Sequence, residues 1–492
     1  MSKFYKYATP EECGISSEKI LDVVKTLDDY KFDTHSLIIA RGDRIIYESY
    51  YAPYDENSLQ RMYSISKSFV AAAAGFAISD GLFTLEDKMV DFFPEYTNGS
   101  QDEALCDVTI KNLLTMSTSM AKYAIWWEKP DRAEAYFSVK SNQHPDTNFS
   151  YDSAGSFILA CIIEKLTGKL MVDYLREKGF SDFGFSDSAY SLLAPGGHSH
   201  ADSGVMCTTR DLYSFAYLIL NNGKIKDKQY LDAKYVKDMK KKQADVHVSH
   251  PFSDHGEGYG YLVWKIPRDG FAFFGMADQF AFCDPATDMI FIITSENHSL
   301  GGITRQLLIH IFENDLVKNV SDTALTENCK AYQELSEYAK GRRLASYTNK
   351  EISPIAKKIN GKKYILDENP AGIKNVRFFF SDDRGIMEYE NAEGLNKLEF
   401  GLGYNIFSKL PGKKRMSLTA SVYEDGAYDC ATSGEWASEN ILRICARVID
   451  TYIGKWVLSV GFTDKGISFH SAKHAQRILD NLSFTSLGKS ED

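Results

Sequence analysis

The 492-residue sequence predicts an α+β fold, in which strands from both ends of an N-terminal domain form one antiparallel sheet flanked by helices and an all-helical region. Three observations carry this prediction. Strand-like runs occur at 36–51 and again at 259–295, helical periodicity fills the chain between them, and short strands separated by Gly, Asp and Asn follow beyond 346. We therefore expect a domain at 1–320, a charged connection at 321–345 and a smaller antiparallel β domain at 346–492.

The individual elements follow from local patterns along the chain. Ser16–Tyr30 has apolar residues at helical spacing and a serine at its start, which predicts an amphipathic helix. Two β-rich runs in Ser36–Tyr51 surround Arg41-Gly42-Asp43 and indicate a hairpin. Segments with an apolar face dominate from Ser64 to about Lys242, and several of them stop at Gly. Strands return near Tyr259, and a last helix is predicted at Thr304–Phe312.

Composition and charge exclude several classes of partner. Lys and Arg total 56 against 67 Asp and Glu, a net charge of −11, so neither nucleic acid nor an anionic membrane is an expected partner. The longest apolar run, Phe69–Ile78, is ten residues long, whereas a membrane-spanning helix needs about 20. The N-terminus is polar and predicts no signal peptide. Eight scattered cysteines without a C-x-x-C pair favour reduced thiols and a cytoplasmic location.

The candidate chemistry rests on a Ser-x-x-Lys pattern. The G-x-S-x-G elbow, the Walker A loop, the H-E-x-x-H helix and the dinucleotide-binding glycine fingerprint are all absent, and no cofactor is predicted. Ser-x-x-Lys occurs four times, at Ser16/Lys19, Ser64/Lys67, Ser119/Lys122 and Ser486/Lys489. Of these serines, Ser64 alone precedes a nearly all-apolar helix. A Lys in the first turn of a buried helix is energetically costly, so its presence there suggests a function.

Ser64 and Lys67 together can form an activated nucleophile. Residues three apart lie on one helical face, so Lys67 can reach the Ser64 hydroxyl, and desolvation would lower the pKa of its amine until it can act as a base. The Ser64 backbone N–H, at a helix N-terminus, can stabilise an oxyanion. The alternative is structural: Ser64 caps the helix and Lys67 extends to solvent.

Four ordered blocks resemble the serine β-lactamase and penicillin-binding-protein superfamily, in particular the class C β-lactamase-related hydrolases that include esterases, D-aminopeptidases and 6-aminohexanoate-dimer hydrolases. The blocks are Tyr63–Tyr96, Val108–Met116, Phe149–Gly168 and Gly204–Lys224, within about residues 10–315. The resemblance implies an antiparallel sheet flanked by helices. It also implies that Tyr151 is a general base or acid working with Lys67, and that Ser153, where Asn is commoner in the family, supports it by hydrogen bonding.

The third motif of the superfamily is placed at Phe273-Phe274-Gly275. Gly275 and Gln279 fit a subset of the family, and the Met276 backbone N–H would then be the second oxyanion donor, opposite that of Ser64. Phe273 stands where relatives carry a cation or imidazole that holds a substrate carboxylate. The protein is therefore expected to be an inefficient β-lactamase and to favour an ester or amide without that carboxylate.

Two further groups have competing interpretations. Trp126 and Trp127, with Tyr136 and Phe137, could form an aromatic wall of a substrate cleft or could be ordinary packing. Five histidines, His198, His200, His247, His250 and His255, form a loose cluster, but they lack a fixed helical spacing. Loop histidines are usually solvated, so no metal site is predicted.

The sequence thus predicts a serine hydrolase that cleaves a small ester, amide or short peptide through an acyl-Ser64 intermediate. Two alternatives remain open: a non-catalytic binding or regulatory protein that retains the pocket, and a peptidase or amidase specific for D-amino acids. Covalent labelling of Ser64 would separate catalysis from simple binding. The patterns do not address the oligomeric state.

Overall fold

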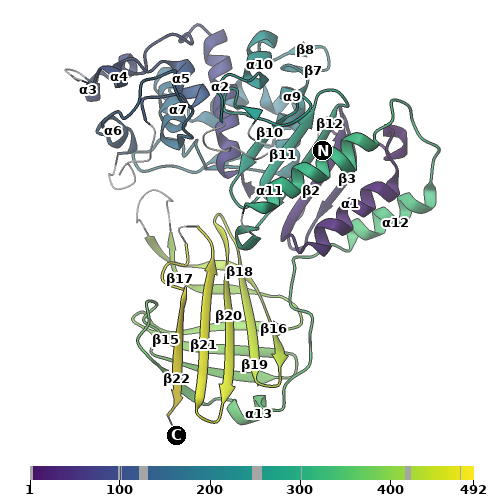
Figure 1. The fold of residues 1–492 in the computed structure, drawn as a ribbon, viewed down its shortest axis with the longest axis vertical. Coiled ribbons are helices and arrows are strands. Elements are labelled where there is room, and N and C mark those ends of the chain that lie inside the picture. The colour runs from purple at the N-terminus through teal and green to yellow at the C-terminus, as the bar shows by residue number, and fades with distance from the viewer. Residues whose placement is uncertain are drawn as a thin grey trace. The chain divides into compact units, whose positions relative to one another are not determined.

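The fold is described from a computed structural model, which covers residues 4–97, 100, 102–120, 131–246, 257–300, 302–415, 423–476 and 478–491. The chain divides into two compact units, Met1–Arg343 and Leu344–Asp492. Together they form a mixed α/β protein with an all-β C-terminal unit (Figure 1). In the described part of the chain, no helix has both the length and the apolar character needed to cross a bilayer.

The first unit is built on a seven-stranded sheet whose order is β1-β3-β2-β12-β11-β10-β9. Its neighbours pair antiparallel except β1 with β3. The β2–β3 hairpin turns at Gly42, where a φ of 56° suits glycine, and β12 pairs directly with β2. The strands are β1 Lys6–Tyr7, β2 Thr34–Arg41, β3 Arg44–Tyr50, β9 Trp264–Lys265, β10 Phe271–Gly275, β11 Gln279–Asp284 and β12 Met289–Ser295.

Helices cover both faces of this sheet. Phe273 packs on Phe215 of α9 (Thr209–Leu220), whereas the neighbouring Phe274 lies under Arg305 of α11 (Ile303–His310). Because successive side chains of a strand point to opposite faces, α9 and α11 lie on opposite sides of the sheet. The predicted N-terminal helix is α1 (Ser17–Asp29), with Ser16 as its N-cap.

The helical region surrounds α2 (Ser66–Ser79), which is buried at every position from Ser66 to Ala77, as its apolar sequence predicts. It packs against α7 (Ser153–Thr167) and α8 (Met171–Glu177). The other helices are α3 Pro94–Thr97, α4 Glu103–Cys106, α5 Ile110–Thr115, α6 Arg132–Phe137 and α10 Ala233–Lys240; the short strands are β4 Gln60–Arg61, β5 Tyr190–Ser191, β6 Val205–Cys207, β7 Lys224–Ile225 and β8 Lys228–Gln229.

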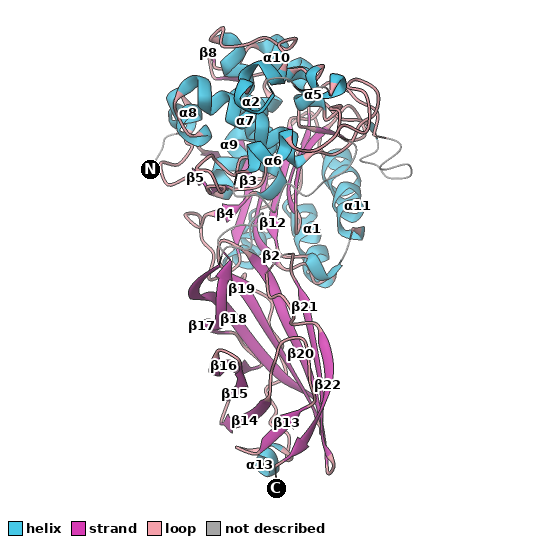
Figure 2. Ribbon diagram, turned by 90° about the vertical axis from the view of Figure 1, so that its left-hand side faces the viewer, coloured by secondary structure: helices cyan, strands magenta, loops and turns pink. Residues whose placement is uncertain are grey.

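The second unit is a closed barrel whose neighbouring strands pair antiparallel, except that β16 meets β18 in parallel where the barrel closes (Figures 1 and 2). Ten strands follow the order β16-β15-β14-β13-β22-β21-β20-β19-β18-β17, and β16 also pairs with β18, which closes the sheet on itself. A helix, α13 (Ala356–Ile359), precedes it. The strands are β13 Lys363–Leu366, β14 Asn375–Ser381, β15 Arg384–Asn391, β16 Gly394–Leu402, β17 Ile406–Arg415, β18 Tyr423–Ser438, β19 Ile441–Ile449, β20 Ile453–Thr463, β21 Gly466–His474 and β22 Phe484–Ser490.

The expected connection at 321–345 contains a helix that belongs to the first unit. Helix α12 (Cys329–Lys340) packs against α1 and β3, and the hydroxyl of Tyr338 donates a hydrogen bond of 2.5 Å to Asp28 of α1. The division between the units falls at its far end, after Arg343. The charged composition of this segment reflects the solvent-facing side of a packed helix.

Candidate active site

Ser64 lies in a short 3₁₀ turn, Tyr63–Ile65, immediately before α2. The chain is anchored on its approach, because β4 pairs with β6 and the Met62 N–H donates to the Val205 carbonyl at 2.9 Å. Tyr63 has a φ of +45°, a conformation that non-glycine residues rarely adopt, and its side chain is 2% exposed. Strained backbone beside a candidate nucleophile is typical of active sites, since the surrounding fold must hold it in place.

The Lys67 amine connects the Ser64 hydroxyl to the interior of the first unit. Its Nζ lies 2.9 Å from Ser64 Oγ and donates to the Asp202 carbonyl at 2.7 Å. The side chain does not reach solvent: Lys67 is 1% exposed. Burial lowers the pKa of Lys67 to about 8, while the carboxylates of Asp202 and Asp152 oppose this shift and Arg132 assists it. A useful fraction of the amine is therefore neutral near physiological pH and can take a proton from Ser64.

Tyr151 completes the group of residues that the sequence predicted. Its ring stacks on Trp264, with centroids 5.7 Å apart, and Lys67 Nζ lies 5.2 Å from the centre of the Tyr151 ring. Burial raises the pKa of Tyr151 to about 12, and a hydrogen bond with Ser64 partly offsets that effect. The phenol is protonated at neutral pH, so its chemistry here is that of a proton donor or relay, with Lys67 as the stronger candidate for the base.

Sequence reasoning missed a buried charged cluster behind Lys67. The Arg132 guanidinium lies 3.2 Å from the Asp202 carboxylate, and both side chains are almost fully buried. Burial by itself would raise the pKa of Asp202, but Arg132 above all, with Lys67, holds that pKa below its usual value. Asp202 thus contributes its carbonyl to the Lys67 amine and its charge to the surrounding field. No local pattern could reveal the pair, because 70 residues separate its members.

Asp152, the residue after Tyr151, has two tasks. It is the N-cap of α7, where its carboxylate accepts a hydrogen bond from the Ala154 N–H at 2.9 Å. Burial raises the pKa of Asp152 to about 6. The cap therefore starts α7 and, as the next residue in the chain, helps to anchor Tyr151. No role was predicted for Asp152 from the sequence.

The segment predicted to be the third motif lies beside the turn that carries Ser64. Strand β10 contacts the 3₁₀ turn that carries Ser64. A Cβ on Gly275 would lie 2.5 Å from the Met62 carbonyl oxygen, so only glycine permits this close approach. Gln279 donates to the carbonyls of Met276 at 3.2 Å and Ser295 at 2.6 Å. Gln279 therefore holds the β10–β11 turn and orients the Met276 peptide from the interior.

One predicted substrate contact needs correction, and the supporting role of Ser153 stays a prediction. Phe273 is fully buried against Phe215 on the α9 side of the sheet, with ring centroids 5.1 Å apart, so it belongs to the core and offers no surface to a ligand. Ser153 is the first residue of α7, and among the described residues its hydroxyl forms no hydrogen bond with Ser64 or Lys67. Trp126 and Trp127 lie outside the described residues.

Other candidates are also accounted for by packing. Tyr136 is 3% exposed and belongs to the core, and Phe137 is partly buried against that core, with its ring 5.0 Å from that of Phe93. His198 Nδ1 lies 2.9 Å from a Glu164 carboxylate oxygen. His200 is buried 3.6 Å from the Asp202 carboxylate, and burial holds its pKa well below the usual value. His247, His250 and His255 lie outside the described residues; within those residues no group of His, Cys, Asp and Glu is arranged to hold a metal.

A cation does act on the site, but from a different element than the third motif. Arg305 of α11 lies over the rings of Phe274 and Phe280, at 4.8 and 5.7 Å, and its charge lowers the pKa of Tyr151 against the larger effect of burial. The carboxylate of Asp278, in the β10–β11 turn, partly compensates Arg305. The sequence offered no signal for this residue, because α11 follows the last strand and lies outside the four motif blocks.

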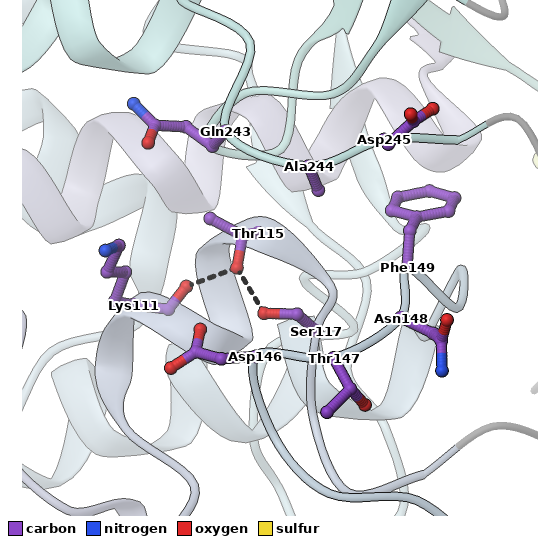
Figure 3. Close-up of a pocket in the computed structure, with 10 residues that line it drawn as sticks. All are labelled: Lys111, Thr115, Ser117, Asp146, Thr147, Asn148, Phe149, Gln243, Ala244 and Asp245. Atoms are coloured by element: carbon purple, nitrogen blue, oxygen red, sulfur yellow. Dashed lines mark hydrogen bonds between the residues drawn. The ribbon is translucent and has the colours of Figure 1, made fainter.

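A pocket of about 440 Å³ has Phe149 as its one aromatic lining residue among those described (Figure 3). Its wall is largely polar, and Thr115 bridges the Lys111 carbonyl and the Ser117 hydroxyl at 2.9 and 2.8 Å. Phe149 links it to the site: it lines the pocket and packs on Trp264, the residue on which Tyr151 stacks.

Comparisons with known proteins identify the family of the chain. Over 308 residues the chain is 20% identical to a 6-aminohexanoate-dimer hydrolase of Paenarthrobacter ureafaciens, covering 58% of this chain and 79% of that protein. It is 25% identical over 181 residues to a lovastatin esterase of Penicillium rubens, covering 31% and 44%. The crystal structure of SurE with D-Leu superposes with a TM-score of 0.50 at 13% identity, covering 92% of this chain and 98% of that chain, and thus shares the fold. Residues 21–306 match the profile of the family described as Beta-lactamase, and the chain belongs to that family.

Proposed function

We propose that the protein is a serine hydrolase that cleaves a small ester or amide through an acyl-Ser64 intermediate. The observation that carries the proposal is the buried contact of 2.9 Å between Lys67 Nζ and Ser64 Oγ, with an amine whose pKa is lowered to about 8. A structural lysine would extend to solvent. This one is enclosed, and desolvation makes it a base.

The proposed reaction uses groups that lie around Ser64. Neutral Lys67 takes the hydroxyl proton as Ser64 Oγ attacks the substrate carbonyl, and the backbone N–H groups of Ser64 and Met276 stabilise the oxyanion. The proton then passes through the Tyr151 hydroxyl to the leaving alcohol or amine, which departs and leaves the acyl-enzyme. Water attacks the ester carbonyl in the second half, giving its proton to the same pair and releasing the acid and free Ser64.

Charge distribution favours substrates without a carboxylate. Phe273 lies in the core and supplies no charge, while Arg305 already faces Asp278. A substrate carboxylate would therefore find no uncompensated cation at the position of the third motif, so β-lactams are expected to be poor substrates. The relatives named for an esterase and for hydrolysis of an amide-linked dimer support the ester or amide class.

The decisive experiment is an activity screen paired with covalent labelling. p-Nitrophenyl esters, D-amino-acid amides and nitrocefin would be tested on the purified protein, and a fluorophosphonate adduct would be mapped by mass spectrometry. We expect ester or amide turnover and an adduct on Ser64, both lost in Ser64→Ala. Ser16→Ala is a matched control, because Ser16 also begins a Ser-x-x-Lys pattern but caps α1 through the Lys19 N–H. Absence of both turnover and labelling would instead favour a binding protein.

A further inference from the structure

The interior of the C-terminal barrel is filled at one end and hollow at the other. An aromatic cluster fills the first end: Phe462 packs with Phe378 and Trp436, at centroid distances of 5.5 and 5.8 Å. The hollow end is a pocket of about 420 Å³. Trp456 lies at this end of β20, six residues before Phe462 on the same face of the strand. A concave, largely apolar pocket of this size at a barrel mouth is a candidate site for a small molecule.

The pocket wall comes from inward-facing residues of four strands. Tyr389 of β15, Leu410 of β17, Tyr428 of β18 and Trp456 of β20 line it, and each is at most 5% exposed. The rings of Tyr389 and Trp456 meet edge to face, with centroids 5.7 Å apart. The Trp456 indole N–H is already satisfied by Ser471 Oγ at 2.8 Å. What Trp456 offers to the pocket is therefore its apolar ring.

The Tyr389 hydroxyl is a polar group in this wall. It makes no hydrogen bond within the described residues, and although the residue as a whole is only 5% exposed, its oxygen is not among the buried, unbonded polar atoms and so opens to the pocket. Burial, with Glu393 at the mouth, raises the pKa of Tyr389, so the hydroxyl keeps its proton and can donate. An acceptor atom on a bound molecule can take the place of the water that this hydroxyl otherwise contacts.

The mouth of the pocket disfavours anions. It carries the carboxylates of Glu393 and Asp480, while the nearby cation Lys473 is bound to Asp480 at 2.9 Å. A carboxylate or sulfonate would meet like charge there with no free cation among the described lining residues. An uncharged apolar molecule avoids this repulsion.

We propose that the hollow end of the barrel binds an uncharged, ring-containing small molecule, whose ring packs on Trp456 and whose acceptor atom takes a hydrogen bond from the Tyr389 hydroxyl. The volume falls within the range of about 300–1,000 Å³ that small-molecule pockets occupy. The site is independent of the proposed hydrolase function, because all of its residues lie in the C-terminal unit.

Nile red, which is uncharged, aromatic and carries a carbonyl acceptor, is a suitable probe for the full-length protein. We expect saturable fluorescence enhancement at one dye per chain, and the same affinity in Ser64→Ala. Leu410→Trp should fill the pocket and weaken binding at least tenfold, whereas Tyr389→Phe should weaken it about two- to tenfold through loss of one hydrogen bond. Phe407→Ala is the matched control: Phe407 is 54% exposed on the same strand as Leu410, so its variant should bind normally.

Several outcomes would overturn the proposal. They are an absence of saturable binding, dye affinity that survives Leu410→Trp, and loss of binding in Phe407→Ala but not in Leu410→Trp. Ile478→Trp, in a loop that lines the same pocket, provides a second blocking variant should Leu410→Trp fail to fold. The anionic dye 1-anilinonaphthalene-8-sulfonate and its uncharged parent N-phenyl-1-naphthylamine test the charge preference. Tighter binding of the sulfonate would contradict the assignment of an uncharged ligand.

Discussion

Replacement of Asp202 by Asn should make Lys67 a base at lower pH. The Asp202 carboxylate is the largest influence that raises the pKa of Lys67 against the effect of burial, so removing its charge lowers that pKa further. Two unit charges attract by about 4 kcal/mol at 4 Å for an effective dielectric constant of about 20, and by about half as much at twice the separation. Because one pKa unit corresponds to about 1.4 kcal/mol, a fall of at least about one unit is expected.

The pH profile of kcat/KM follows from this shift. With a pKa of about 8, roughly 1% of Lys67 is neutral at pH 6. With a pKa near 7, the neutral fraction at pH 6 would be about 9%, so the ratio of kcat/KM at pH 6 to its plateau should rise about tenfold. The direction in which the pH profile shifts follows from the role of Lys67. A base works in its neutral form, so a lower pKa of Lys67 extends activity to lower pH.

The assay is hydrolysis of an ester whose leaving group does not titrate, measured from pH 5 to 10 for the wild type and for Asp202→Asn. The variant also leaves Arg132 without its charged partner, which costs about 3–5 kcal/mol in a buried pair, so thermal unfolding must show that it is folded at the assay temperature. Asp107→Asn removes an exposed carboxylate and serves as the control that should not move the profile. This reasoning would be refuted if Asp202→Asn is folded and the acidic limb of its kcat/KM profile stays in place or moves to higher pH.

Three further outcomes are expected. Tyr151→Phe should lower kcat/KM for an activated ester by about 10²–10⁴-fold, the usual loss of a general acid or base, and near wild-type activity would reduce Tyr151 to a pocket wall. Nitrocefin should turn over more slowly than the best ester because the buried Phe273 supplies no cation, and equal rates would show that another group holds the carboxylate. Limited trypsin digestion should cut first near exposed Arg343 or Lys350, as expected at a boundary between compact units, and first cuts within the helical region would argue against that boundary.

Local spacing was enough to identify the Ser64–Lys67 pair. The two residues are three apart at the start of a helix, and helical geometry alone brings such residues together. The apolar residues that follow established that the helix is buried, and burial is the main cause of the lowered pKa of Lys67. The catalytic roles of both residues remain predictions that labelling and kinetics can test.

Alternation along strands left one ambiguity that the sequence could not resolve. In β10 the pattern is aromatic on both faces, so a motif position by itself does not indicate whether a side chain faces the substrate or the core. The structure places Phe273 against Phe215 of α9, and Phe274 on the opposite face beneath Arg305 of α11. Only the packing of a helix on one face of the sheet distinguishes these directions.

Local patterns were sufficient to predict the buried helix and the contact between the serine and the lysine at its start, because both depend on residues close together in the chain. The tertiary structure alone decided which distant charges surround that pair. Arg132 and Asp202 meet behind Lys67, and Arg305 acts on Tyr151 from a helix beyond the last strand of the sheet. Electrostatic interactions depend on separation in space and on burial, and neither quantity exists for a pair of distant residues until the chain has folded.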